Sequence, residues 1–123
     1  MNHYLSVIIP VYNDVLNLMR CLDALERQTL DKSKYEIIVV DNGSTHDLES
    51  KLGSRPTVHL VSERRPGSYS ARNKGILSSN GDILAFTDSD CIPNEDWLEK
   101  GLSSLSTKDS IGFVAGNLIF FPK

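Results

Sequence analysis

Two aspartates separated by one residue, Asp88 and Asp90, form the part of the sequence best suited to do chemistry. Two carboxylates in a bent loop can place oxygens on one hard divalent cation, and such a cation can also bind a diphosphate. Ligand sets made only of oxygen favour Mg²⁺ or Mn²⁺ over zinc. An isolated Asp-X-Asp is weak evidence, because aspartates are common in loops and at helix N-termini. This pair directly follows a predicted strand over residues 82–87, and that position favours a metal site.

Two more carboxylates follow predicted strands, Asp14 after the first and Asp41 after the second. Carboxylates gathered without matching cations raise one another's pKa, so a cation is expected among them. The sequence therefore predicts one pocket in which Asp41 accepts a hydrogen bond from a base N–H and a metal meets a pyrophosphate. Arg72 or Lys74 is expected to help hold the phosphate charge.

Strand and helix patterns alternate along the chain and must position these groups. Apolar, β-branched runs predict strands over 5–10, 35–40, 57–61, 82–87 and 111–115. Helical periodicity predicts helices from Asp14 onward, over 47–52, over 69–79 and from 93–96 onward. Pro10 is expected to end the first strand, and Gly81 to adopt the left-handed conformation after the third helix. This order predicts an α/β fold with a mostly parallel sheet flanked by helices and ligands at the carboxyl ends of the strands.

Length and composition restrict the class of protein. With 123 residues, 40% of them apolar, the chain is expected to form a single domain over 1–123. A net charge of −3 argues against nucleic acid as a partner, and no apolar stretch is long enough to span a membrane. Neither the two cysteines nor the three histidines have metal-ligand spacing. Cys21 is expected in the core. With no disulfide framework indicated, a reduced, cytoplasmic setting fits best.

The turn after the first predicted strand, residues 10–14, contains no glycine. It therefore carries neither the G-x-G-x-x-G turn of dinucleotide-binding proteins nor a Walker loop. A phosphate must be held elsewhere, which again indicates the acidic residues that follow the fourth strand.

Four segments, in order, resemble motifs of the inverting glycosyltransferases of family 2. They are SVIIPVYN at 6–13, EIIVVDNGS at 36–44, ARNKG at 71–75 and FTDSDCIP at 86–93. The resemblance covers nearly the whole chain and implies the Rossmann-like A-type fold of nucleotide-diphospho-sugar transferases (GT-A). It also implies roles: Pro10, Val11 and Tyr12 flank a uracil, Asp41 bonds its ring N–H, Arg72 and Asn73 line the nucleotide pocket, Asp88 faces the ribose or donor sugar, and Asp90 ligates the metal.

The same resemblance implies transfer of a sugar, with inversion, from a nucleotide-diphosphate sugar, most simply a UDP-sugar, to an acceptor saccharide or lipid-linked glycan. Two departures from the family pattern limit what the resemblance implies. Asp14 is followed by Val15 and Leu16, so the carboxylate that helps hold the nucleoside is not identified. The family continues into an acceptor-binding half that supplies the catalytic base, which is expected beyond Lys123. The chain is therefore expected to be a truncated donor-binding part, with membrane association open for the full-length protein.

Other interpretations stay open at this point. A phosphatase of the haloacid dehalogenase type would use Asp88 as a nucleophile, although its motif belongs on the first strand. A non-catalytic sugar-nucleotide-binding module is the second alternative. Individually, Tyr12 could cover the first helix, Asn73 could be a surface residue and Arg72 could form a surface ion pair. An apolar strand candidate between Leu118 and Phe121 predicts self-association through an uncovered edge.

Overall fold

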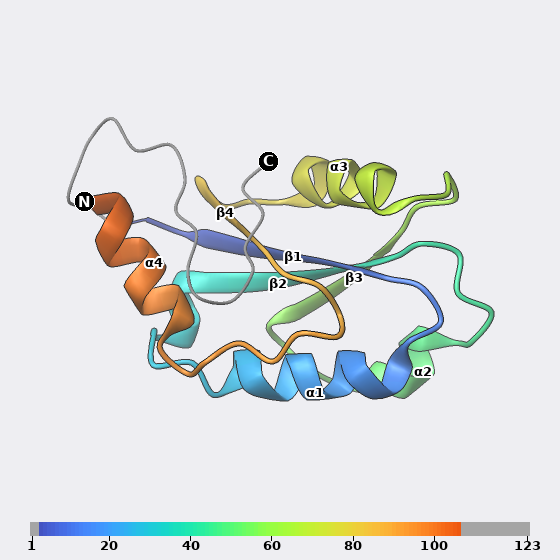
Figure 1. The fold of residues 1–123 in the computed structure, drawn as a ribbon, viewed down its shortest axis with the longest axis horizontal. Coiled ribbons are helices and arrows are strands. Elements are labelled where there is room, and N and C mark those ends of the chain that lie inside the picture. The colour runs from blue at the N-terminus through green and yellow to red at the C-terminus, as the bar shows by residue number, and fades with distance from the viewer. Residues whose placement is uncertain (1–2, 107–123) are drawn as a thin grey trace.

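A computed structural model describes residues 3–106 of the protein (Figure 1). The predicted strand over 111–115 and the apolar segment between Leu118 and Phe121 lie outside the described residues. The elements, in order, are β1 (Leu5–Val11), α1 (Val15–Glu26), η1 (Lys32–Lys34), β2 (Tyr35–Asp41), α2 (Leu48–Leu52), β3 (Val58–Ser62), α3 (Ser68–Ser78), β4 (Ile83–Phe86) and α4 (Trp97–Ser106).

The four strands form one parallel sheet with the order β3-β2-β1-β4. β1 pairs with β2 along its whole length, from Leu5 opposite Tyr35 to Val11 opposite Asp41. On its other side β1 pairs with the shorter β4 only as far as Ile8, which lies opposite Phe86. The predicted α/β fold with a parallel sheet is confirmed.

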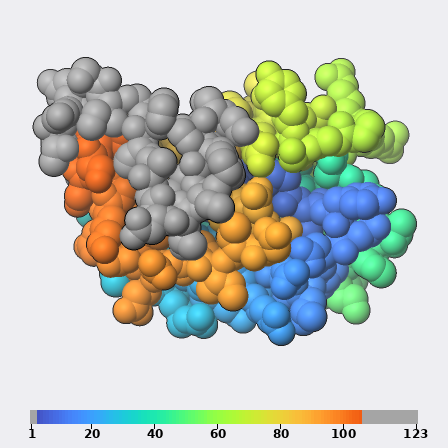
Figure 2. All heavy atoms as spheres, in the orientation of Figure 1, coloured from blue at the N-terminus to red at the C-terminus, as the bar shows by residue number. Residues whose placement is uncertain are grey.

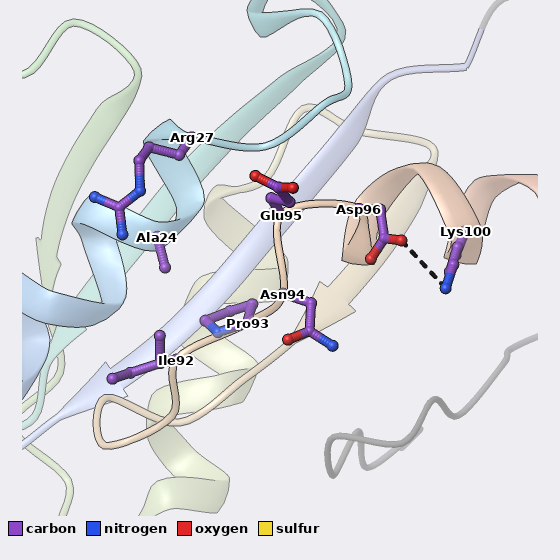
Figure 3. A pocket seen from close by; sticks show the side chains of 8 residues that line it. All are labelled: Ala24, Arg27, Ile92, Pro93, Asn94, Glu95, Asp96 and Lys100. Carbon is purple, nitrogen blue, oxygen red and sulfur yellow. Dashed lines mark ion pairs between the residues drawn. The ribbon is translucent and has the colours of Figure 1, made fainter.

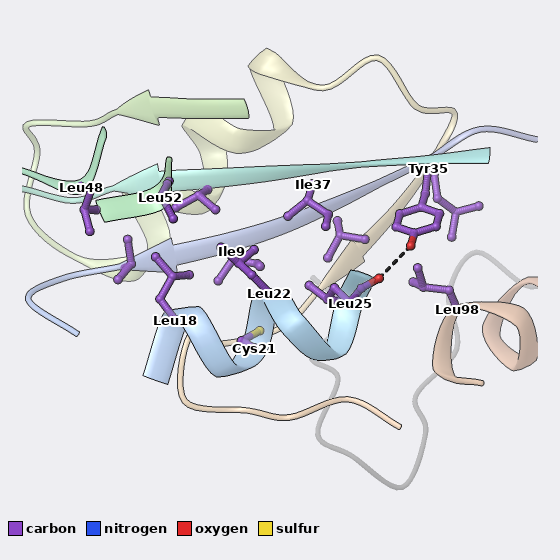
Figure 4. Packing of buried hydrophobic residues seen from close by; sticks show 14 of the residues in the cluster. Ile9, Leu18, Cys21, Leu22, Leu25, Tyr35, Ile37, Leu48, Leu52 and Leu98 are labelled. Atoms are coloured by element: carbon purple, nitrogen blue, oxygen red, sulfur yellow. Dashed lines mark hydrogen bonds between the residues drawn. The ribbon is translucent and has the colours of Figure 1, made fainter. Parts of the chain in front are cut away.

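The helices lie on both faces of the sheet, with α1 and α2 on one face and α3 on the other (Figure 1). This follows from the strand order: the chain runs outward from β1 to β3, then returns to the other side of β1 to form β4. Right-handed crossovers in opposite directions place their helices on opposite faces. The α1 face holds the larger core, in which Leu18, Leu22 and Leu25 of the predicted helical stripe are buried (Figure 4).

Cys21 belongs to the same core and is fully buried with a free thiol, as expected for a cysteine that packs like a small hydrophobe. Burial raises the pKa of this thiol to about 12, and the nearby Cys91 and Asp88 contribute. The Cys21 thiol lies 3.7 Å from the backbone oxygen of Asp88, so the core of α1 reaches the residues that follow β4.

On the opposite face α3 packs very close to the sheet. Ala71 is fully buried against Ile8 and the apolar residues of β2. At Gly75, a Cβ atom would lie 3.2 Å from Cγ2 of Val40 and closer still to the side chain of Ile8. Glycine is therefore needed at this position of the helix because only it permits the close approach.

The structure corrects the expected end of the first strand. β1 continues through Pro10 to Val11. The backbone oxygen of Val11 accepts a hydrogen bond from Asn42 N, so Val11 faces β2. Its neighbour Pro10 faces the opposite side, where β4 has already ended at Phe86. The missing N–H of proline therefore interrupts no ladder, and the strand tolerates it.

The role expected of Gly81 is also wrong. Among the described residues, the glycines with positive φ are Gly43, Gly53 and Gly67, and α3 ends at Ser78 with its C-cap residue, Ser79, in an extended conformation. Gly81 is required by space instead, because a Cβ there would lie 2.6 Å from the Ser6 hydroxyl and 2.7 Å from the Tyr4 carbonyl oxygen. The turn is fixed by Glu36, whose carboxylate accepts from the Asn80 backbone N–H at 2.7 Å.

Candidate functional site

The candidate site begins where β1 and β4 separate. The last hydrogen bond between them runs from Thr87 N to Ile8 O at 3.3 Å, after which β1 is paired only with β2. The chain beyond β4 turns back on itself, with Cys91 N donating to Asp88 O at 3.0 Å. We call residues 88–91 the acidic turn. Since β1 lies between strands that connect in opposite directions, this is the switch point at which open α/β sheets bind ligands.

The acidic turn brings three potential ligand groups together. Side-chain atoms of Asp88, Asp90 and Cys91 all lie within 4.8 Å of one another. Asp88 is half-buried and Asp90 is exposed, so the turn can present oxygens to a cation while remaining open to solvent. Two carboxylate oxygens fit a hard divalent cation such as Mg²⁺ or Mn²⁺. The sequence had assigned no ligand role to Cys91, because one cysteine beside an aspartate pair has no recognised ligand spacing.

Arg72 reaches the acidic turn from α3. Its Nη2 lies 3.2 Å from Oδ1 of Asp88, and its side chain is only 14% exposed. The Nε atom of Arg72 is buried without a hydrogen-bond partner among the described residues. Buried donors are normally paired, so this Nε is an exception beside the acidic turn, where the guanidinium supplies positive charge. Arg72 is therefore largely buried while Asp88 is half-exposed, so the pair lies at the edge of the candidate site and is not formed by two fully exposed surface side chains.

Asp41 lies at the end of β2, on the other side of β1 from the acidic turn. Two strand spacings of about 4.8 Å separate β2 from β4, or roughly 10 Å. Among the described residues, Asp41 is not part of the cluster of possible metal ligands, which the structure limits to the acidic turn. Its Oδ1 accepts from Ser44 N at 2.9 Å. The structure thus brings Asp88 and Asp90 together and leaves Asp41 at a distance that suits another part of a ligand.

The loops after β1 and β2 are joined by side-chain hydrogen bonds. Asn13, which has a positive φ of 49°, donates its N–H to the Ser44 hydroxyl at 2.9 Å. The amide oxygen of Asn13 accepts from Thr45 N at 2.8 Å. Asp14 is connected to the acidic turn through the Ser89 hydroxyl at 3.4 Å. The strand ends therefore form one connected rim.

Two predicted site residues face solvent. Tyr12 is 62% exposed, so it does not serve to cover the first helix. Asn73 is exposed on α3, one residue after Arg72. Pro10 and Val11 are held at the end of β1 beside Asp41. Sequence reasoning missed Asn42, whose side chain makes three hydrogen bonds to the loop before α3.

A pocket of about 530 Å³ lies beyond the acidic turn, between the end of α1 and the start of α4 (Figure 3). The described residues that line it include Arg27, Pro93, Glu95 and Lys100, and the ion pair between Asp96 and Lys100 measures 3.1 Å. Asp88 and Asp90 do not line it. Figure 2 shows the chain after β4, in orange, at the surface between α3 and α1. The acidic turn is therefore accessible from outside without this pocket.

Comparisons with known proteins agree with the geometry. Residues 6–122 match the family described as Glycosyl transferase family 2. The chain is 45% identical over 122 residues to the glycosyltransferase AglE of Haloferax volcanii, covering 95% of this chain and 40% of that protein. It is 32% identical to the glycosyltransferase GlyG of Streptococcus pneumoniae, again covering 95% of this chain and 40% of the other.

Solved structures show the same architecture. The mannosyltransferase PcManGT of Pyrobaculum calidifontis, in complex with GDP-Man and Mn²⁺, matches with a TM-score of 0.79 and 29% identity over 86% of this chain and 33% of that chain. TarS 1-349 of S. aureus, in complex with UDP-GlcNAc, matches with a TM-score of 0.71 and 25% identity over 85% of this chain and 31% of that chain. The chain thus spans about 40% of the length of the curated relatives named above. Within residues 3–106, no helix is long and apolar enough to cross a membrane.

Proposed function

The chain belongs to glycosyl transferase family 2, and from this premise we propose that it binds the nucleotide-diphosphate sugar from which the complete protein transfers a sugar. The observation that carries the proposal is the acidic turn at the switch point of the sheet, with the partly unpaired Arg72 guanidinium beside it. Residues 1–123 would act as a single donor-binding domain. The family match covers residues 6–122 of this length.

The donor would lie across the end of β1. Asp41 at the end of β2, together with the exposed Tyr12 and the backbone of Pro10 and Val11, would hold the nucleoside. The diphosphate would then lie near Asp88, roughly 10 Å away over two strand spacings. Asn73, exposed beside Arg72, would line the same pocket. The separation of Asp41 from the acidic turn supports this extended arrangement.

Asp90 and Asp88 would hold Mg²⁺ or Mn²⁺, since both carboxylates lie on one turn that is open to solvent. Such a cation, when bound, neutralises the charge that develops on a departing diphosphate. Arg72 would contribute its positive charge beside the same phosphate group, since its guanidinium lies against Asp88. The complex of PcManGT with GDP-Man and Mn²⁺ supports this assignment.

In the complete protein, an acceptor hydroxyl would attack the anomeric carbon from the face opposite the diphosphate and invert it. The acceptor is expected to be a saccharide or a lipid-linked glycan. The base that removes the hydroxyl proton is not assigned to any residue of this chain. A haloacid dehalogenase-like phosphatase is disfavoured, because Asp88 follows the fourth strand of the described sheet and not the first.

Isothermal titration calorimetry tests the proposal directly. We expect UDP or a UDP-sugar to bind in the presence of Mn²⁺ and to bind at least about tenfold more weakly after chelation. Asp90→Asn should remove most of the metal dependence. Asp96→Asn is the matched control, because Asp96 is an aspartate paired with Lys100 outside the acidic turn. Binding that is equally tight without metal, or unchanged in Asp90→Asn, contradicts the proposed metal site.

The choice of UDP is tested in the same experiment by adding GDP-sugars as competitors. Solved relatives hold either UDP-GlcNAc or GDP-Man, so the fold accommodates both nucleotides. Preference for a GDP-sugar would retain the donor-binding function and overturn the assignment to uridine.

A further inference from the structure

We propose that Asn42 is a positioning residue of the donor site. It connects the end of β2, next to Asp41, to the loop that leads into α3 and so to Arg72. This inference rests on the proposed function, because the groups that it positions are those proposed to contact the donor. Asn42 itself need not touch the ligand.

The Asn42 side chain uses both of its donors and one of its two acceptor lone pairs on a single loop. Its Nδ2 donates to the backbone oxygens of Glu63, at 3.0 Å, and Arg65, at 2.7 Å. Its Oδ1 accepts from the backbone N–H of Gly67 at 3.0 Å. We call residues 63–67 the rim loop. A primary amide offers two donors and one carbonyl oxygen, which is the set that these three backbone groups require.

The backbone of Asn42 is itself fixed to the sheet. Asn42 N donates to Val11 O at 2.8 Å, and Glu63 N donates to Asp41 O at 2.9 Å. The side chain therefore extends the pairing of β2 with β3 beyond the point where the regular ladder ends at Ser62. The rim loop is thus attached to the end of β2 through the Asn42 side chain and, at its first residue, through the backbone of Asp41.

The rim loop has few other means of holding its conformation. Arg64, Arg65, Pro66 and Gly67 are all exposed, so the loop buries little apolar surface. Gly67 occupies the N-cap position of α3 with φ 105°, and no side chain caps the helix there. The hydrogen bond to Asn42 at this glycine therefore takes the place of a cap in fixing where α3 begins.

Arg72 lies in the second turn of α3, five residues after Gly67. The middle of α3 is fixed to the sheet through Ala71 and Gly75. Its N-terminal end is held by the rim loop. Loss of the Asn42 amide would free that end and let the Arg72 guanidinium move relative to Asp41. A donor that must contact both groups would then bind more weakly.

The test compares Asn42→Ala with Asn80→Ala by calorimetry with UDP and Mn²⁺. Asn80→Ala is the matched control, because it removes an amide donor at 3.1 Å from Glu36, at the opposite end of the sheet. We expect Asn42→Ala to weaken nucleotide binding about tenfold, the effect of one or two lost hydrogen bonds. Asn80→Ala should leave the affinity unchanged even if it lowers the melting temperature as much.

A double-mutant cycle separates positioning from a general loss of stability. If Asn42 acts through Arg72, the Asn42→Ala substitution should weaken binding far less in an Arg72→Ala background than in the wild type. Hydrogen exchange gives a readout that needs no ligand: amides of residues 67–71 should exchange faster in Asn42→Ala than in Asn80→Ala.

The outcomes are distinct. If the wild type binds no nucleotide, the proposed function fails, while hydrogen exchange still decides whether Asn42 holds the rim loop. If the wild type binds but Asn42→Ala and Asn80→Ala lose equal affinity, or if the Asn42 and Arg72 effects simply add, the positioning role is overturned. Unchanged exchange at 67–71 overturns it as well.

Discussion

Replacing Gly75 with alanine would place a methyl group between α3 and the sheet. Its Cβ would lie 3.2 Å from Cγ2 of Val40, 3.3 Å from Cγ1 of Ile8, and closer still to Cγ2 of Ile8. Carbon atoms pack best at about 3.5–4.0 Å, so all three contacts are repulsive. Ile8 cannot move aside, because it is fully buried and its branched side chain is restricted at χ1.

Two effects oppose each other in this variant. Alanine in a helix interior stabilises by up to about 1 kcal/mol relative to glycine. Overpacking of a tight core costs about 1–3 kcal/mol. Since the clash involves rigid side chains, we expect the cost of overpacking to exceed the gain in helix propensity. The net loss in the free energy of unfolding is about 1–2 kcal/mol. For a domain of 123 residues, each kcal/mol lowers the melting temperature by about 4 °C.

Urea denaturation followed by circular dichroism measures the effect. Gly101→Ala is the matched control, since a Cβ at Gly101 in α4 meets nothing within 4 Å. This control should raise the denaturation midpoint slightly through helix propensity alone. A Gly75→Ala protein as stable as the wild type, or a control that loses as much stability, would refute the reasoning. Because Arg72 lies one turn before Gly75, the variant should also bind nucleotide more weakly.

Three further predictions concern other parts of the molecule. Burial alone would raise the pKa of Glu36, but hydrogen bonds from Ser6 and Asn80 outweigh it and hold that pKa below the ordinary 4.5. The stabilisation by the Glu36 carboxylate is thus fully present above pH 4.5 and is lost as the pH falls through the folded-state pKa. Urea titrations at decreasing pH should therefore show that acid lowers the stability of the wild type more steeply than that of Glu36→Gln. The same dependence of stability on pH in both proteins would disprove this. In the native protein, Ellman's reagent should modify the partly exposed Cys91 and reach the buried Cys21 only after denaturation; equal rates for both thiols would contradict the described core. Asp47 caps α2 by accepting from Ser50 N, so Asp47→Ala should lower the melting temperature, and an unchanged melting temperature would exclude a stabilising cap.

The fold could be predicted because its signals are local. Continuous apolar runs such as 37–40 are typical of strands buried on both faces, and the stripe from Leu18 to Leu25 has helical period. The alternation of the two then determines the parallel sheet and the edge at which polar residues gather. Both the fold and the position of the acidic turn follow from such local sequence patterns.

The details that failed depend on contacts between distant residues. Whether Pro10 ends a strand depends on where β4 stops, almost eighty residues later. The reason for Gly81 lies in Ser6 and Tyr4, and the importance of Asn42 lies in the backbone of the rim loop. An asparagine in a turn carries no sign of which backbone groups it will bind.

The position of β4 beside β1 has a consequence for how the chain acquires its structure during synthesis. Leu84 pairs with Ser6, so β1 cannot complete its pairing until residues 78 positions later in the sequence have been synthesised. β2 can pair with β1, and β3 with β2, well before this, while the Ile8 side of the sheet still lacks α3. Long-range pairing is entropically slow, and the acidic turn follows β4. Pulse-labelling hydrogen exchange should therefore show β4 protected after β2, which makes the carboxylates of Asp88 and Asp90 the last part of the rim to be assembled.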